Sequence, residues 1–401
     1  MELNVNSEIT KLKKVLLHRP GHEIENFTPS LMKRFLFDDI PYLKVAQEEH
    51  DLFSQTLVKN GIEVYYIEDL IEETMAHEQA KMSFLNEFLN KSKILTLKKD
   101  IVLDYLLSLN DNKDIISKII SGIRKDEIGS EVKNLSALSE QDYPFLSDPL
   151  PNMYFTRDIG SVIGHGMTLS CMRSSVRKRE TLFLKYILKF HPDFSKKSIP
   201  NWYYPNDNSP IEGGDILILK QDLLAIGLSQ RTRASAIETM ASNIFNSDNS
   251  KIKTILAFQL PKKRSFMHLD TVFTQVDSDK FTVHSRIEGP LKVYSIKASQ
   301  KGLSINEESM TLKHILEKYL NRKVTLIKCG LGDRIIGGRE QWNDASNTLA
   351  IKPGEVIVYD RNYITNRALQ DNGIKTHVIK GSELSRGRGG PRCMSIPLER
   401  E

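Results

Sequence analysis

The sequence predicts an α/β fold that is built from repeated strand–helix–strand units and interrupted by a helical insertion. A helix that ends in Asn-Gly-Ile and runs into a strand occurs near both ends of the chain, at residues 42–66 and 368–379. Weaker versions of this unit lie between them. In addition, no proline occurs between Pro41 and Pro144, which favours helices in that stretch.

The first unit opens with an apolar strand at 13–18, which ends at Pro20-Gly21. Apolar side chains at helical spacing predict a helix over 42–60, and a strand at 62–66 completes the unit. Residues 71–138 are rich in Leu, Ile, Lys, Glu and Asn and carry further apolar positions at helical spacing. We therefore expect this stretch to form a helical insertion.

The later units are predicted from strand pairs and from helices that lead into strands. Turn signals separate paired strands at 216–220 and 223–228, and again at 349–352 and 356–360. A helix at 236–245 precedes a strand at 254–260, and a helix that ends near 321 precedes a strand at 324–328. Repetition of one unit predicts internal pseudosymmetry.

Composition excludes several classes of function. The 401 residues carry a net charge of +5, and no basic stripe is interleaved with aromatic residues, so we expect no nucleic-acid partner. No stretch approaches the roughly 20 apolar residues of a membrane span. The three cysteines lack the spacing of a disulfide framework, which favours a reducing, cytoplasmic location.

The loop before the C-terminal strand carries Cys393 among glycines and arginines. Gly389-Gly390 would allow positive φ and close approach to a ligand, and Pro391 stiffens the segment before the thiol. Nearby cations favour a thiolate, and three lie here: Arg386, Arg388 and Arg392. A buried structural cysteine is the alternative.

Further polar clusters stand at 152–158, 212–215 and 267–271. His268 and Asp270 alternate, so both would lie on one face of an extended segment, either in a cavity or toward water. A metal site is not predicted, because the His18–His22 spacing crosses Pro20-Gly21 and no C-x-x-C pair exists. One thiol, one imidazole and several carboxylates together suit covalent catalysis on a cationic substrate.

Six blocks of the chain resemble the signature blocks of arginine deiminases in order and in spacing: 36–40, 152–158, 212–215, 268–270, 339–344 and 385–394. The resemblance implies a five-bladed α/β propeller, the pentein fold, with residues 1–72 as first blade, 73–145 as inserted all-helical domain and 146–401 as the remaining blades. It implies hydrolysis of L-arginine to L-citrulline and ammonia through an S-alkylthiouronium intermediate. It further implies no cofactor or metal and a homo-oligomer, either a dimer or a tetramer.

The resemblance also implies the role of each site residue. Cys393 would be the nucleophile, His268 the acid/base, and Glu212 the partner of His268. Asp158 and Asp270 would grip the guanidinium. The clamp on the substrate carboxylate would be Asn152, Arg177 (or its neighbour Arg179) and Arg231. Phe155 would form a wall beside the aliphatic stem. Arg388 and the backbone near Leu36 would form a gate.

Four other functions remain to be distinguished from a deiminase. An amidinotransferase or a dimethylarginine hydrolase would share the fold, but the predicted insertion and the block at 36–40 favour the deiminase. A non-catalytic arginine-binding protein would be expected to lose Cys393, His268 or a carboxylate. A papain-like thiol protease is disfavoured by the position of the nucleophile, last in the chain.

Overall fold

Five sheets repeat one strand pattern in the computed structural model, which describes residues 1–92, 94, 96–128, 143–205, 209–287 and 291–401. In each sheet a central strand pairs antiparallel with one neighbour and parallel with another. The first sheet is β19 (Ile396–Arg400), β1 (Leu12–Leu17) and β2 (Glu63–Tyr66), and the second is β5 (Gly160–Ile163), β6 (Gly166–Leu169) and β7 (Asn201–Tyr203). The third contains β8 (Ile216–Lys220), β9 (Leu223–Leu228) and β10 (Thr254–Gln259), and the fourth is β11 (Phe273–Gln275), β12 (Lys280–Val283) and β15 (Thr325–Lys328). The fifth is β16 (Leu349–Lys352), β17 (Glu355–Tyr359) and β18 (Lys375–Ile379).

A helix separates the two parallel strands of each sheet in the sequence, as a parallel crossover requires. These helices are α2 (Leu43–Lys59), α8 (Glu180–Phe190), α10 (Ala234–Phe245), α11 (Leu312–Leu320) and α13 (Tyr363–Asp371). The predicted units at both ends of the chain are confirmed as α2–β2 and α13–β18. Both predicted hairpins are confirmed as well.

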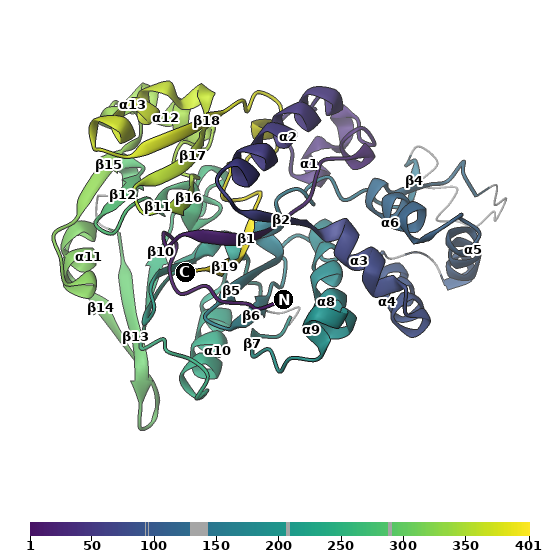
Figure 1. The fold of residues 1–401 in the computed structure, drawn as a ribbon, viewed down its shortest axis with the longest axis horizontal. Helices are drawn as coiled ribbons and strands as arrows, with labels where there is room; N and C mark the ends of the chain where they lie inside the picture. Colours follow the sequence, from purple (N-terminus) through teal and green to yellow (C-terminus); the bar gives the residue numbers. More distant parts are fainter. Residues whose placement is uncertain (93, 95, 129–142, 206–208, 288–290) are drawn as a thin grey trace.

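The hairpin of β13 (Val293–Ser299) and β14 (Gly302–Glu308) extends the sheet of β8–β10 to five strands. This hairpin was not predicted from the sequence: apolar residues alternate only over short stretches, at Ile296 and Ala298 and again at Leu303 and Ile305, and half of its residues are exposed. Figure 1 shows it as a projection from the body of the molecule.

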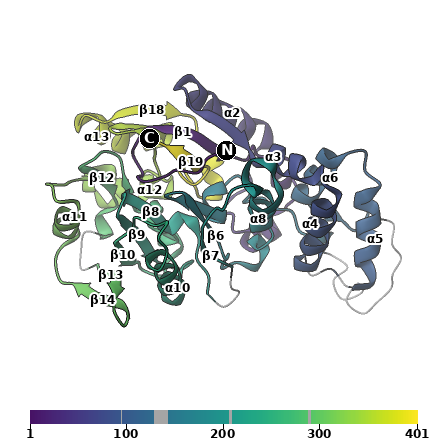
Figure 2. The ribbon, with the colours of Figure 1, turned by 60° about the horizontal axis from the view of Figure 1, so that its bottom comes forward.

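Helices occupy most of the described part of the predicted insertion: the end of α3 (Ile67–Met75), which begins before residue 73, and then α4 (Glu78–Lys91), α5 (Thr96–Leu107) and α6 (Asn112–Ser121). They lie to one side of the sheets in both views (Figures 1 and 2). The prediction of an all-helical segment over 73–145 is wrong at its end, where β3 (Ile123–Arg124) pairs with β4 (Phe145–Ser147). Residues 129–142 of that segment lie outside the described residues.

These helices share a hydrophobic core with the neighbouring sheet. Phe84 of α4 meets Phe183 and Tyr186 of α8 with ring centroids 5.3 Å apart in each case. Buried side chains of α3 and α6 continue the same cluster. The boundary between helical segment and α/β body is therefore an apolar interface. Among the described residues, no helix combines the length and apolarity that a membrane crossing requires.

We predict that Phe84→Ala destabilises this interface by about 3–5 kcal/mol, the usual cost of deleting a fully buried aromatic ring. Thermal unfolding and limited proteolysis of wild type and variant measure the effect. Tyr363→Ala, at a side chain that is 70% exposed, is the control and should leave the midpoint nearly unchanged. An unaltered midpoint in Phe84→Ala would show that the ring does not hold the two parts together.

Candidate active site

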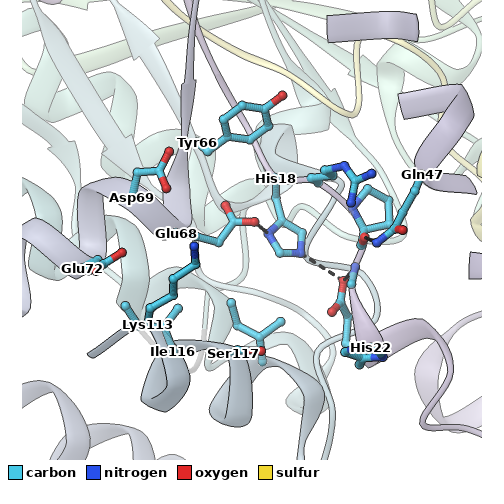
Figure 3. A pocket seen from close by; sticks show the side chains of 15 residues that line it. His18, His22, Gln47, Tyr66, Glu68, Asp69, Glu72, Lys113, Ile116 and Ser117 are labelled. Atoms are coloured by element: carbon cyan, nitrogen blue, oxygen red, sulfur yellow. Dashed lines mark hydrogen bonds and ion pairs between the residues drawn. The ribbon is translucent and has the colours of Figure 1, made fainter. Parts of the chain in front are cut away.

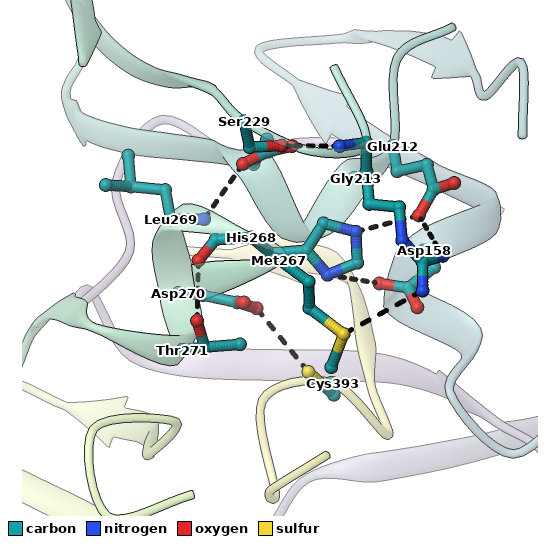
Figure 4. Close-up of polar contacts among 12 residues, drawn as sticks. Asp158, Glu212, Gly213, Ser229, Met267, His268, Leu269, Asp270, Thr271 and Cys393 are labelled. Carbon is teal, nitrogen blue, oxygen red and sulfur yellow. Dashed lines mark hydrogen bonds and ion pairs between the residues drawn. The ribbon is translucent and has the colours of Figure 1, made fainter. Parts of the chain in front are cut away.

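Five short turns converge on the site, and each immediately precedes the strand that forms the antiparallel pair of its sheet. Asp158 lies in the turn before β5, Glu212 before β8, and His268 and Asp270 before β11. The Cys393 loop precedes β19, and a fifth turn, 343–348, precedes β16. Figure 4 shows side chains from four of these turns meeting in one place. The repeated architecture thus delivers residues from distant parts of the sequence to a common centre.

His268 lies between two carboxylates and is 1% exposed. Its Nε2 is 2.7 Å from Oε2 of Glu212, and its Nδ1 is 3.6 Å from Oδ1 of Asp158. Burial opposes a charged imidazole, but Asp158, Glu212 and Asp215 raise the pKa of His268 to about 9. The ring is therefore an imidazolium at neutral pH, able to donate a proton.

Glu212 is held from three directions. Besides His268, its Oε2 accepts from Arg231 at 3.3 Å, and its Oε1 accepts from the backbone N–H of Arg173 at 2.9 Å. Burial opposes ionisation, yet Arg231 and His268 bring the pKa of Glu212 to about 2. Glu212 and His268 thus form a fixed carboxylate–imidazolium pair.

Asp158 and Asp270 are arranged alike. Oδ2 of Asp158 accepts from Arg177 at 2.6 Å, and Oδ2 of Asp270 accepts from Arg392 at 2.7 Å. In both residues the other oxygen, Oδ1, is buried without a hydrogen bond. Oδ1 of Asp158 has only the ion pair with His268, and Oδ1 of Asp270 has no partner among the described residues. Because buried carboxylate oxygens are costly unless paired, both residues point to a cationic ligand with several N–H donors.

Cys393 lies beside Asp270, with Sγ 3.7 Å from Oδ2, and its backbone N–H donates to Oδ1 of Asn347 at 2.8 Å. Burial, followed by Asp270, Asp158 and Asp344, raises the pKa of the thiol well above its ordinary value of 9.0, and only partial relief comes from Arg392.

The prediction that three arginines favour a thiolate is wrong for the protein without substrate. All three are engaged elsewhere: Arg386 with Asp39 and Glu383, Arg388 over the ring of Trp342, and Arg392 with Glu8 and Asp270.

The glycines of this loop also act differently from the prediction. Neither Gly389 nor Gly390 has positive φ; that conformation belongs to Arg388, at 69°. A Cβ on Gly389 would lie 2.2 Å from the ring of Phe155, and one on Gly390 would lie 2.5 Å from the Asn347 carbonyl oxygen. The glycines therefore allow close packing of the loop against its neighbours.

The segment at 267–271 is not an extended strand. His268 is extended, at φ −131° and ψ 161°, but Leu269–Thr271 then forms a 3-10 turn. Oδ1 of Asp215 accepts from the Leu269 N–H at 2.8 Å and fixes this turn. His268 and Asp270 still reach the same site, though through a turn and not through strand alternation.

Asn152, Arg177 and Arg231 adjoin the cluster. Nδ2 of Asn152 donates to the Phe35 carbonyl at 2.8 Å. Arg177 contacts Asp158 and also Glu180, at 2.9 Å. Arg179 instead donates to Ser147 and to the Asp148 carbonyl, and its guanidinium lies over Phe88. Of the two candidate arginines, Arg177 is therefore the one at the site.

The backbone at Leu36 and the side chain of Arg388, the predicted gate, are each held by contacts of their own. Leu36 has φ 64°, and its carbonyl accepts from Arg264 at 2.5 Å. The guanidinium carbon of Arg388 lies 3.5 Å from the ring centroid of Trp342. A cation–π contact of this kind holds the arginine without using its N–H donors.

Several residues at the site were not predicted as site residues: Glu8, Glu180, Asp344, Asn347 and Arg392. Their roles depend on contacts between segments distant in sequence, such as Arg392 with Glu8 at 3.0 Å. Only Glu180, three residues after Arg177, could have been found from local spacing.

A cation could in principle be held by Asp158, Glu212 and His268, whose donor atoms all lie within 4.8 Å of one another. A metal needs a neutral imidazole with a free nitrogen. Here Nε2 of His268 is bonded to Glu212, and the raised pKa keeps the ring protonated. The geometry therefore suits an organic cation better than a metal.

A separate surface pocket of about 390 Å³ lies between the loop after β1 and helices α3 and α6 (Figure 3). Within it the ring of His18 joins Glu23, at 3.0 Å, to Glu68, at 2.7 Å. Burial opposes the charge, but the two carboxylates raise the pKa of His18 to about 10. This ionic clamp ties the loop to α3, and none of the candidate site residues lines the pocket.

Comparisons with known proteins agree on one family. The sequence model of the arginine deiminase family matches residues 33–400. The chain is 53% identical to an arginine deiminase of Clostridium perfringens over 405 residues, covering 100% of this chain and 98% of that protein. It is 50% identical to an arginine deiminase of Streptococcus agalactiae over 404 residues, with the same coverage.

Solved structures show the fold. The N-terminal domain of ArgZ, an arginine dihydrolase from cyanobacteria, aligns with a TM-score of 0.55 and 14% identity over 96% of this chain and 97% of that chain. A dimethylarginine dimethylaminohydrolase aligns with a TM-score of 0.53 and 13% identity over 96% and 99%. The chain therefore shares the pentein fold of these proteins.

We predict that alkylation of Cys393 by iodoacetamide, followed by peptide mass spectrometry, keeps accelerating with pH up to and beyond 9.0, because the pKa of the thiol is raised above that value. Asp270→Asn removes a neighbouring negative charge and should move the curve to lower pH. Asp360→Asn, on the surface, should leave it in place. A plateau reached near neutral pH in the wild type would contradict the raised pKa.

Proposed function

The chain belongs to the arginine deiminase family, and we propose that it hydrolyses L-arginine to L-citrulline and ammonia through a covalent intermediate on Cys393. The observation that carries this assignment is the pair of buried carboxylates beside the thiol: Oδ1 of Asp270 has no hydrogen bond, and Oδ1 of Asp158 has only the imidazolium of His268, at 3.6 Å. A guanidinium is a planar array of N–H donors that pairs with carboxylates and leaves its faces open to attack.

Substrate binding supplies the positive charge that the surroundings of the Cys393 thiol lack. In the free protein, carboxylates near Cys393 disfavour its thiolate. A guanidinium placed between Asp158 and Asp270 adds a positive charge there and lowers the pKa of the thiol. The nucleophile therefore becomes reactive when its target arrives, with Oδ2 of Asp270, 3.7 Å away, as the acceptor in reach of the Sγ–H.

Attack by Sγ of Cys393 on the guanidinium carbon forms a C–S bond and a tetrahedral adduct. His268, an imidazolium, donates a proton to one terminal nitrogen, and the C–N bond breaks to release ammonia. Neutral His268 then takes a proton from water, whose oxygen attacks the S-alkylthiouronium carbon. The resulting adduct loses its hydroxyl proton as the C–S bond breaks, which releases citrulline and the thiolate. That proton converts the departed ammonia to ammonium, so guanidinium and water become a ureido group and ammonium.

The aliphatic and α-amino acid parts of the substrate require a second set of contacts. We assign the α-carboxylate to Arg177, Arg231 and Asn152, the stem to Phe155, and the gate to Arg388 and the Leu36 backbone. Without substrate, Arg177 contacts Asp158 and Arg231 contacts Glu212, so the substrate carboxylate would replace part of these contacts. The two oxygens of a carboxylate can accept N–H groups from both guanidinium groups.

The finer architecture belongs to the same proposal. We interpret the five repeated sheets as the blades of a five-bladed propeller around the site, with 1–72, 73–145 and 146–401 as first blade, helical insertion and remaining blades. Support comes from the shared strand pattern and the five convergent turns. A cytoplasmic location and a dimeric or tetrameric state remain part of the proposal.

Incubating the purified protein with L-arginine should produce citrulline and ammonia in equal amounts. Cys393→Ala should abolish both, whereas Cys329→Ala, at a buried thiol whose Sγ lies 2.9 Å from Oγ of Ser346, should retain most turnover. Acid quenching during turnover should trap an adduct on the peptide that contains Cys393. Transfer of the amidino group to added glycine or lysine, without ammonia, would replace this proposal by an amidinotransferase.

The carboxylate clamp predicts strong selection against agmatine, which is arginine without its carboxylate. Losing a buried charge pair costs about 3 kcal/mol or more, so Arg231→Ala should lower kcat/KM for arginine by roughly 100-fold. Agmatine should lose less, and the gap between the two substrates should narrow. Arg322→Ala, at an exposed position, is the matched control. Equal losses for both substrates would remove Arg231 from the clamp.

A further inference from the structure

We propose that Asp344 determines substrate specificity by accepting hydrogen bonds from the α-ammonium group of arginine. The inference rests on the proposed function and adds to it a residue for the one charged group of the substrate that has no side-chain partner. Asp344 would contact substrate without taking part in bond making or breaking.

Asp344 lies in the one convergent turn that has no role yet in the proposed chemistry. Of the five turns that precede an antiparallel strand, four carry the nucleophile, the acid/base pair and the guanidinium carboxylates. The fifth, before β16, carries Asp344 and Asn347. Asn347 accepts from the N–H groups of Cys393 and Gly390, at 2.8 and 3.2 Å, so this turn packs directly on the thiol loop.

The carboxylate of Asp344 has no hydrogen-bond partner. Asp344 is 2% exposed, and both Oδ1 and Oδ2 are buried without a hydrogen bond. Its charge is felt at Cys393, where it raises the pKa of the thiol. A cation that satisfies Asp344 therefore belongs to a molecule bound beside the thiol, because a buried carboxylate without a partner is unfavourable.

Arg388 compensates the charge of Asp344 only in part: it lowers the pKa of Asp344, but no hydrogen bond joins the two side chains. Arg388 is also 2% exposed, and its three guanidinium nitrogens are buried without hydrogen bonds. Its guanidinium lies on Trp342. Among the described residues, no ion pair joins Arg388 to Asp344. Asp344 is thus open to a ligand ammonium.

The other roles open to Asp344 fit less well. A proton acceptor for the thiol is already present in Asp270, at 3.7 Å from Sγ. A second guanidinium ligand is not needed, since Asp158 and Asp270 each offer a free oxygen. With the carboxylate on Arg177 and Arg231 and the ammonium on Asp344, the substituents at the α-carbon would be fixed separately, and L-arginine would be distinguished from D-arginine.

The test compares L-arginine with 5-guanidinopentanoate, which lacks only the α-amino group. For Asp344→Asn, kcat/KM for arginine should fall roughly 10- to 100-fold, mainly through KM, as expected for a lost charged hydrogen bond. Turnover of 5-guanidinopentanoate should change little, because its guanidinium and carboxylate contacts remain. Asp360→Asn is the control for a surface aspartate. Equal losses for both substrates, or no loss for arginine, would overturn the proposal.

A second measurement uses the wild type alone. Burial raises the pKa of Asp344 to about 7; Arg388 and Arg361 act to lower it, and Asp270 and Asp38 to raise it further. Cys393, Tyr154 and Tyr359 are the other titratable groups that sense this carboxylate. Protonation below neutral pH removes the negative charge that pairs with the ammonium, so the ratio of kcat/KM for arginine to that for 5-guanidinopentanoate should fall as pH drops from 8 to 5.

The ratio cancels the titration of groups that serve both substrates, such as His268 and Cys393. A ratio that stays constant over this range would overturn the assignment of Asp344. Absence of citrulline from wild type with L-arginine would instead overturn the proposed function, so the two failures are distinguishable.

Discussion

A single buried guanidinium joins the parts of the molecule that must meet at the site. Arg392 is 0% exposed. It donates to Glu8 near the N-terminus, to Asp270 before β11 and to the Ile216 carbonyl at the start of β8. Such a charge is tolerated in the interior only when its donors are satisfied. The N-terminal segment, two sheets and the thiol loop are therefore held in register by one side chain next to Cys393.

The site without substrate has an excess of negative charge around a neutral thiol. Asp158, Asp270 and Asp344 all keep buried oxygens without hydrogen bonds, while Arg177 and Arg392 each bond to a single oxygen of Asp158 and Asp270, and Arg388 lies on a ring. Electrostatic preorganisation of this kind favours a ligand that brings several positive groups at once. Because neighbouring charges act together with burial, burial alone does not decide whether His268, Glu212 or Cys393 is protonated.

Local pattern was sufficient to predict much of the fold and of the chemistry. Helical spacing over 42–60 and the Asn-Gly stop gave α2 and β2, because these signals depend on neighbours in sequence. Polar clusters that interrupt apolar strands located Asp158, Glu212 and His268. The partners of Arg392, the packing of Gly389 on Phe155 and the raised pKa of Cys393 could not be predicted, because each depends on segments brought together only by folding.

The strand that follows the thiol loop, β19, pairs antiparallel with β1, which lies at the opposite end of the chain. During synthesis, β1 therefore precedes this neighbour by more than 370 residues and stays without it until β19 has been translated. Cys393 follows every other site residue in the chain. Arg392 and Cys393 both belong to the loop that leads into β19, so the contacts of Arg392 with Glu8 and Asp270 require that loop in place; closing the first sheet and completing the candidate site are therefore one folding event.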